Sequence, residues 1–213
     1  MNRIIDVKER EKVFYDFDIT NQDVIYNVSE NSKLAVYQYG INIDNDIVIN
    51  LNGENAEVEY HYSTINYDDH KYKIVVNHNS SKTISNIYNH GVNVKDNKLD
   101  FDITGYVPNK SDKSECNQKN QILNIKDGKS TILPKLLIDN YDVVSSHSAY
   151  IGKFKDEILF YLMSRGISEK VSYDLLIKSF LVNGCERKEI IETLEKEIDK
   201  IWGGIWIEKT FQH

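Results

Sequence analysis

Short segments of strand-forming residues recur about every ten residues between positions 20 and 145, and this spacing constrains the fold most strongly. Apolar and polar residues alternate within these segments, most clearly over 57–62 and 99–103, so that each segment has one apolar face. Because no helical pattern lies between the segments, the sequence predicts an all-β region rather than alternating strands and helices. The predicted strands are 23–28, 33–39, 46–50, 56–65, 72–77, 83–88, 99–107, 121–125 and 135–138.

Three all-β architectures fit this spacing: a sandwich, a barrel and a β-solenoid. No strong internal repeat is present, which argues against a regular solenoid. Signals for tight hairpins are scarce, because Asn52-Gly53 is the only Asn-Gly or Asp-Gly pair between two strong alternating runs. The scarcity of hairpins favours parallel coils over an antiparallel meander.

The pattern becomes helical after residue 150. Residues 156–165 carry apolar side chains on one helical face, and Gly166 follows as the residue expected to end that helix in the left-handed conformation. Ser168 is the predicted N-cap of a second helix. The predicted apolar stripe of this second helix consists of Val171, Leu175, Leu176 and Phe180.

A third helix is predicted over 186–202, where apolar residues recur at helical spacing and the other positions are mostly charged. The chain is therefore predicted to be mainly β, with a β domain over 1–150 and a small helical domain over 151–213.

The charge and cysteine content exclude several classes of protein. A formal net charge of −7 argues against binding nucleic acid through a general basic surface. Two cysteines, Cys116 and Cys185, are too few for a disulfide framework. The first residues lack the apolar core of a signal peptide, and no uncharged apolar run is long enough to span a membrane. We therefore predict a cytoplasmic protein without a membrane or nucleic-acid partner.

The usual catalytic motifs are also missing from the sequence. It contains no phosphate-binding glycine loop, no Gly-x-Ser-x-Gly motif, no His-Glu-x-x-His and no Cys-x-x-Cys. Histidines at positions 61, 70, 78 and 90 are scattered through strands and turns, where hydrogen-bonded or solvated imidazoles are more common than metal ligands. The sequence thus carries none of the motifs that mark these enzyme classes.

Three segments towards the C-terminus form a specific combination. They read Leu-Pro-Lys-Leu-Leu-Ile at 133–138, Asp-Val-Val-Ser-Ser-His-Ser-Ala-Tyr-Ile-Gly at 142–152, and Leu-Phe-Tyr-Leu-Met-Ser-Arg-Gly-Ile at 159–167. This combination resembles the core signature of the SufB/SufD family, the scaffold proteins of the SUF system for iron–sulfur cluster assembly. The resemblance covers about residues 45–185 and implies a strand, a turn containing His147 and the start of a helix, in that order.

The family resemblance also implies a fold and partners. It implies a right-handed parallel β-helix followed by a small C-terminal helical domain. In the family, the β-helices pair to form the SufB–SufD heterodimer, and the C-terminal helices dock on SufC, an ABC-type ATPase. The chain is accordingly expected to be a scaffold subunit that leaves ATP hydrolysis to that partner. Because only about 20 residues precede the first predicted strand, it resembles a minimal, core-only member.

The histidine segment is closer to SufD than to SufB. SufD-like chains read Cys-Ser-His-Gly-Ala-Thr, and this chain has Ser145 at the position of the cysteine. SufB-like chains carry a reactive cysteine shortly before the proline strand, where this chain has Gly128 and no cysteine. The change at Ser145 matters because a hydroxyl does not replace a thiolate as a soft ligand for iron or sulfide.

Candidate site residues follow from the resemblance. Those for cluster assembly are His147, Cys116 and Ser145, with His147 also a tentative metal ligand; Cys116 is expected in a polar loop over 110–120. No stably bound cofactor is expected, but a transient iron–sulfur cluster is. The candidates for docking the ATPase are Phe160, Tyr161, Arg165 and Phe180.

Three functional hypotheses remain open. In the first, the chain is a SufD-like subunit that pairs with a SufB-like or identical subunit and binds a SufC-like ATPase. In the second, it is a minimal homodimeric scaffold that assembles the cluster itself with the ATPase. In the third, it is a carbohydrate-binding or carbohydrate-active β-helix, which its 14 tyrosines permit but its lack of clustered carboxylates disfavours.

Overall fold

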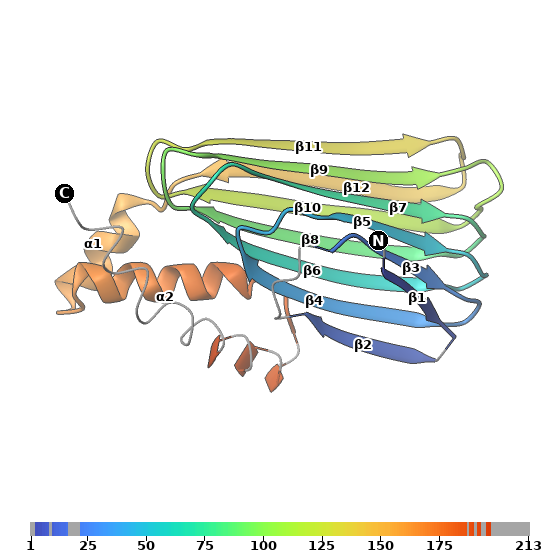
Figure 1. The fold of residues 1–213 in the computed structure, drawn as a ribbon, viewed down its shortest axis with the longest axis horizontal. Helices are drawn as coiled ribbons and strands as arrows, with labels where there is room; N and C mark the ends of the chain where they lie inside the picture. The colour runs from blue at the N-terminus through green and yellow to red at the C-terminus, as the bar shows by residue number, and fades with distance from the viewer. Residues whose placement is uncertain are drawn as a thin grey trace.

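In a computed structural model, residues 3–181, apart from the few that the structure does not describe, form two six-stranded parallel sheets followed by two helices (Figure 1). The structure describes residues 3–8, 10–16, 22–186, 188–189, 191–192 and 195–196. The strands are β1 (Arg3–Val7), β2 (Glu11–Asp16), β3 (Val24–Val28), β4 (Lys33–Ile41), β5 (Asp46–Leu51), β6 (Glu57–Asn66), β7 (His70–His78), β8 (Ile84–Asn93), β9 (Lys98–Val107), β10 (Ser114–Asn124), β11 (Lys129–Ile138) and β12 (Val143–Gly152). The helices are α1 (Asp156–Ser164) and α2 (Glu169–Leu181).

Successive strands alternate between the two sheets. One sheet has the order β1-β3-β5-β7-β9-β11 and the other β12-β10-β8-β6-β4-β2, and neighbouring strands are parallel. The chain therefore winds in coils that stack on one another, which confirms the predicted parallel β-helix. Neighbouring strands keep their register, so side chains from successive coils form columns along the axis of the solenoid.

The interior is apolar in the early coils and polar in the late ones. Every second side chain of a strand points inward, and the early coils fill the space with aliphatic and aromatic groups such as Leu34, Ile49 and Tyr60, all 0% exposed. In β10 the corresponding positions are polar, and Asn120 there accepts a 2.7 Å hydrogen bond from Asn89 in the preceding coil. Such bonds satisfy polar groups that water cannot reach.

The helices begin and end where the sequence predicts. Gly166 has a φ of 83° and follows α1, with its backbone N–H donating to the carbonyl of Met163 at 3.0 Å. The Ser168 hydroxyl caps α2 by accepting from the backbone N–H of Val171. The two predicted helix boundaries at Gly166 and Ser168 are confirmed.

The apolar stripe predicted for α2 is wrong at Val171 and Leu175, whereas Phe180 does pack against the solenoid. The side chain of Ile177 is 1% exposed against the outer face of the even-numbered sheet, whereas Val171 and Leu175 are 45% and 46% exposed. The helix is fixed there because the carbonyl of Leu181 accepts a 2.7 Å hydrogen bond from the Ser63 hydroxyl of β6. The sheet therefore covers the face centred on Ile177 and leaves part of the predicted stripe in solvent.

Several other predicted elements need correction or remain untested. Strands β1 and β2 precede the first predicted strand, and the predicted histidine turn is part of the ten-residue strand β12. The predicted third helix over 186–202 falls largely outside the described residues. The division into domains at residue 150 stays a prediction; β12 ends at Gly152 and α1 begins at Asp156.

Candidate functional site at the last coil

The last described coil, formed by β11 and β12, leaves both of its strands at sheet edges. β11 pairs only with β9 and β12 only with β10 within the described part of the chain. Their other backbone edges carry unpaired hydrogen-bonding groups, which is the usual template for adding another strand. Large apolar side chains lie exposed on the same two strands: Leu133, Leu137, Val144, Tyr150 and Ile151.

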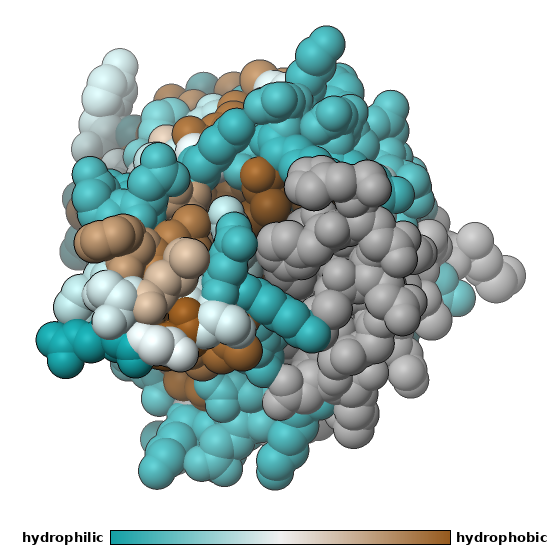
Figure 2. Space-filling view, turned by 90° about the vertical axis from the view of Figure 1, so that its left-hand side faces the viewer, coloured by the Kyte–Doolittle hydropathy of each residue, from teal (hydrophilic) through white to brown (hydrophobic). Residues whose placement is uncertain are grey.

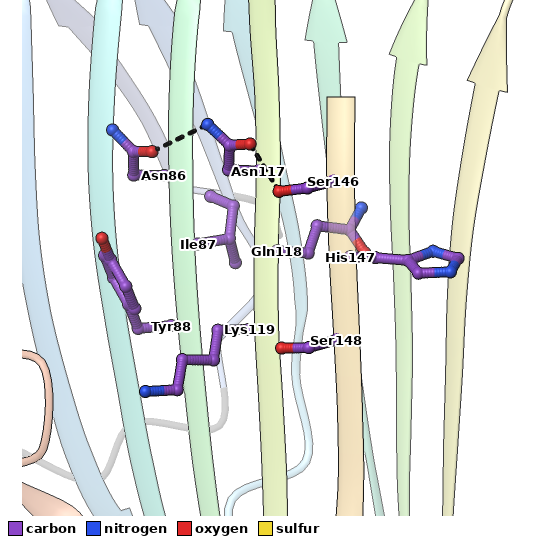
Figure 3. Close-up of a pocket in the computed structure, with 9 residues that line it drawn as sticks. All are labelled: Asn86, Ile87, Tyr88, Asn117, Gln118, Lys119, Ser146, His147 and Ser148. Carbon is purple, nitrogen blue, oxygen red and sulfur yellow. Dashed lines mark hydrogen bonds between the residues drawn. The ribbon is translucent and has the colours of Figure 1, made fainter. Parts of the chain in front are cut away.

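His147 lies in the middle of β12, where it is exposed, and not in a turn as predicted. Its register partner is Gln118 of β10, an inward-facing and buried residue. Figure 3 shows the imidazole pointing away from Ser146 and Ser148, on the other side of the strand. The imidazole therefore belongs to the interior column of the solenoid, and it is exposed because no further coil covers it.

Cys116 is an interior residue of β10, so its predicted place in a polar loop is wrong. It is 1% exposed, and a Cβ added at Gly105 of β9 would clash with its Sγ, which shows how closely the thiol packs on that backbone. Burial raises the pKa of the Cys116 thiol, although a hydrogen bond with Ser85 opposes the shift. The group is therefore a protonated thiol at neutral pH.

The three residues predicted for cluster assembly lie on the neighbouring strands β10 and β12. Cys116 and Ser145 are register partners in one interior column, and His147 follows Ser145 two residues later on the same face of β12. The column continues inward to Ser85, whose hydroxyl lies 2.9 Å from Nε2 of the buried His78. Burial lowers the pKa of His78 to about 4, so this imidazole is neutral at pH 7.

Two buried acceptors in this region have no hydrogen-bond partner. They are Oε1 of Gln118, the register partner of His147, and Oγ of Ser145, the register partner of Cys116. The amide nitrogen of Gln118 donates to the carbonyl of Lys135 in β11 at 3.3 Å, which joins the two sheets across the interior. Unpartnered buried oxygens are costly, so a donor or a cation supplied from outside would be favoured here.

Sequence reasoning missed Ser85, Gln118 and His78. Their signal is present but non-local, because residues of one interior column are separated by a whole coil of the chain. Aligning the strands coil by coil would have placed Ser85, Cys116 and Ser145 in a single column. Among the described residues, no group of three or more His, Cys, Asp or Glu side chains is arranged to hold a metal ion.

The four residues predicted to dock an ATPase divide into two groups. Phe160 and Tyr161 of α1 are 75% and 57% exposed, and the guanidinium of Arg165 stacks 5.3 Å from the Tyr161 ring. Phe180 of α2 instead packs edge-on against His90 of β8 at 5.2 Å between ring centres. Apolar side chains gather on this end of the molecule (Figure 2), including Ile158, Phe160, Tyr161, Met163, Val171 and Leu175.

These features define a class of protein: a parallel β-solenoid with an open last coil, an exposed histidine on it and a helical appendage with an apolar surface. Residues 9–180 match the family described as "SUF system FeS cluster assembly, SufBD core domain". The chain therefore belongs to the SufBD core family, as the sequence motifs predicted.

Two curated relatives agree with this assignment. The chain is 28% identical over 121 residues to "Iron-sulfur cluster assembly protein SufD" of Bacillus subtilis (strain 168), covering 53% of this chain and 28% of that protein. It is 51% identical over 45 residues to "Iron-sulfur cluster assembly SufBD family protein PH1385" of Pyrococcus horikoshii, covering 21% of this chain and 10% of that protein. The chain thus spans less than a third of either relative.

The described residues include no helix that could span a membrane. Neither α1 nor α2 is long and apolar enough to cross a bilayer.

Proposed function

We propose that this chain is a non-catalytic subunit of an iron–sulfur cluster assembly complex, and that its last coil is where cargo and partner subunit meet. The observation that carries the proposal is the position of His147, an exposed interior-facing imidazole beside two unpaired strand edges. A neutral imidazole is a good ligand for iron, and iron here is cargo that is bound and passed on. The chain itself retains no cofactor.

The chemistry of the coil gives His147 the leading role. Its imidazole is open to solvent, whereas the Cys116 thiol is buried and protonated, and Ser145 offers only a hydroxyl. A thiol must lose its proton to become a good ligand for iron, and burial opposes that loss. His147 therefore binds incoming iron first, and Cys116 contributes only if a partner changes its surroundings.

The unpaired edge of β12 supports pairing with a SufB-like or identical subunit. A ten-residue edge strand with exposed apolar side chains is costly to leave in water and suits strand addition by a second β-helix. Both the heterodimer and the homodimer remain in the proposal. The homodimer corresponds to a minimal scaffold that assembles the cluster without a SufB-like partner.

A charge placed on this edge tests the pairing. Val144→Lys in β12 should abolish dimer formation, measured as molar mass by light scattering, alone and after co-expression with a SufB-like subunit. Ile4→Lys is the matched control, because Ile4 and Val144 are both 63% exposed and lie on edge strands at opposite ends of the solenoid. If Val144→Lys paired as tightly as the control, the role of β12 would be refuted. The molar mass measured without the SufB-like subunit distinguishes a homodimer from a heterodimer.

The exposed apolar surface of α1 supports docking of a SufC-like ABC ATPase. We propose Phe160, Tyr161 and Arg165 as the contact and exclude Phe180, whose ring packs against His90 of the solenoid. Large aromatic and Arg side chains are the residues that most often dominate interface energies.

Co-purification tests this contact. Phe160→Ala should remove most of the co-purified ATPase while leaving the thermal unfolding temperature unchanged, since the ring makes little contact within the chain. Tyr141→Ala, at a still more exposed aromatic position outside the helices, is the control and should retain the ATPase. Full retention by Phe160→Ala would contradict the proposed docking face.

Membership of the SufBD core family favours the assembly role over the carbohydrate alternative. The cytoplasm stays the predicted compartment, because ABC-type ATPases hydrolyse ATP there and the proposal places this subunit beside one.

A further inference from the structure

A stack of aromatic rings runs along the outer face of the even-numbered sheet. Tyr15, Tyr37, His61 and Tyr88 occupy the same register position on β2, β4, β6 and β8. The rings of Tyr37 and His61 lie 4.8 Å apart and those of His61 and Tyr88 4.6 Å apart, with interplanar angles of 11° and 15°. This spacing is close to the separation of neighbouring strands, so each coil adds one ring to the stack.

The stack ends at Tyr88 although the sheet continues. The next two positions of the column are Lys119 on β10 and Ser148 on β12, neither of which has a ring. A groove of about 410 Å³ lies at this point. The outward-facing residues that line it are Asn86, Tyr88, Asn117, Lys119, Ser146 and Ser148, and Ile87, Gln118 and His147 between them complete the lining. Figure 3 shows the Lys119 side chain extending towards Tyr88, while the His147 imidazole points to the other side of β12 from Ser146 and Ser148.

Hydrogen-bond donors dominate the walls of the groove. The Ser146 hydroxyl donates to Oδ1 of Asn117 at 2.7 Å, and Nδ2 of Asn117 donates to Oδ1 of Asn86 at 3.3 Å. This chain of bonds uses the amide oxygens and leaves Nδ2 of Asn86 and the second hydrogen of Asn117 free to donate. The ammonium of Lys119 has no ion pair within the described part of the chain and adds a positive charge.

Burial of the ring raises the pKa of Tyr88, and two carboxylates, Glu59 and Glu186, lie near enough to raise it further; Glu59 is already engaged by other side chains. Glu59 is the register partner of Asn86, but Nε2 of His61 lies 2.8 Å from its Oε1, and the Tyr37 hydroxyl donates to the same oxygen at 3.0 Å. Glu59 is thus held within the aromatic stack, and the groove beside it presents an aromatic face, amide donors and a free ammonium.

We propose that this groove binds a small anion carrying a planar ring, of the class of a nucleoside monophosphate. The ring would pack beside Tyr88 at the end of the stack, and its edge would accept hydrogen bonds from the amide donors. The anionic group would pair with Lys119. The volume of the groove lies within the usual range for small-molecule sites and exceeds what a bare inorganic anion needs.

Binding of adenosine 5′-monophosphate to the purified chain, measured by isothermal titration calorimetry, tests the proposal. Adenosine and inorganic phosphate, titrated separately, should each bind at least about tenfold more weakly, because each supplies only one of the two interactions. Raising the salt concentration should weaken binding of the monophosphate. No measurable binding of the monophosphate would overturn the proposal, as would equal binding of phosphate alone.

Two variants separate the contacts. Lys119→Gln should weaken monophosphate binding about tenfold or more and leave adenosine binding unchanged, and Tyr88→Leu should weaken both. Lys71→Gln on the opposite sheet is the control and should bind as the unmodified chain does. Circular dichroism checks that both variants fold. If Tyr88→Leu does not fold, Lys119→Gln alone tests the site. Binding of the monophosphate that is unaffected by Lys119→Gln would refute the site. Because the His147 imidazole points the other way, a negative result leaves the assembly proposal untouched.

Discussion

Substituting Gly105 by alanine tests the placement of Cys116 inside the solenoid. Gly105 is an inward-facing residue of β9, and a Cβ at this position would clash with Sγ of Cys116. It would also lie 3.2 Å from Nε2 of Gln118 and 3.3 Å from Cδ2 of Leu136, contacts that small side-chain movements relieve. The thiol is therefore the main obstacle to the added methyl group.

The size of the effect follows from this clash. Inserting a methyl group into a tightly packed core costs about 1–3 kcal/mol, so Gly105→Ala should lower the free energy of unfolding by that amount. Replacing the thiol by a smaller group should make room, and Cys116→Ala combined with Gly105→Ala should recover about 1 kcal/mol or more of the loss relative to additive behaviour.

Urea unfolding of the unmodified chain, the two single variants and the double variant measures this coupling. Gly105→Ala should have a lower transition midpoint, and the double variant should unfold later than the sum of the single effects predicts. If Cys116 lay in a surface loop, as the sequence suggested, the two effects would be additive. Additivity within about 0.3 kcal/mol would refute the interior position of the thiol.

Three further results are expected. Burial lowers the pKa values of His78 and His90 from 6.5 to about 4 and about 3, so the unfolded chain binds protons that the folded chain does not. The free energy of unfolding should therefore fall as the pH is lowered from about 6.5 to 4. His90→Gln should make this fall shallower in urea titrations at several pH values. If the dependence of the unfolding free energy on pH were unchanged, the burial of neutral His90 would be contradicted. Ile177→Ala should cost about 2–5 kcal/mol in the same assay, whereas Leu175→Ala should cost under about 0.5, and equal costs would contradict the orientation of α2. Ser168→Ala should cost about 1 kcal/mol through loss of the α2 cap, and no change would show that the cap is not needed.

The strands that sequence reasoning found are those with one apolar face. Predicted strands 33–39, 46–50 and 99–107 correspond to β4, β5 and β9, because most of their inward-facing positions are aliphatic or aromatic; in β4 the outward-facing side chains are buried as well. Whether such strands pair in parallel depends on contacts between distant residues. The scarcity of hairpin signals pointed towards parallel coils, and the family resemblance indicated a parallel β-helix.

The candidate site was misread where the interior is polar. Alternate positions of β10 from Ser114 to Asn120 are buried, yet they hold Ser, Cys, Gln and Asn, so the segment reads as a polar loop. The same holds for β12, where Ser145 and His147 face inward between other polar residues. Some of these side chains form hydrogen bonds between coils, as Asn120 does with Asn89, and a local pattern does not reveal such partners.

The central claim is that His147, on the open last coil, receives iron during cluster assembly. The most direct test is anaerobic purification of the chain with its ABC ATPase and paired subunit, followed by analysis of iron and sulfide per complex. His147→Ala should lower both contents while the complex and its unfolding temperature stay as in the unmodified chain, since an exposed side chain contributes little to stability. Ser146→Ala, on the opposite face of the same strand, should leave both contents unchanged. Iron and sulfide contents of His147→Ala equal to those of the unmodified complex would contradict the claim.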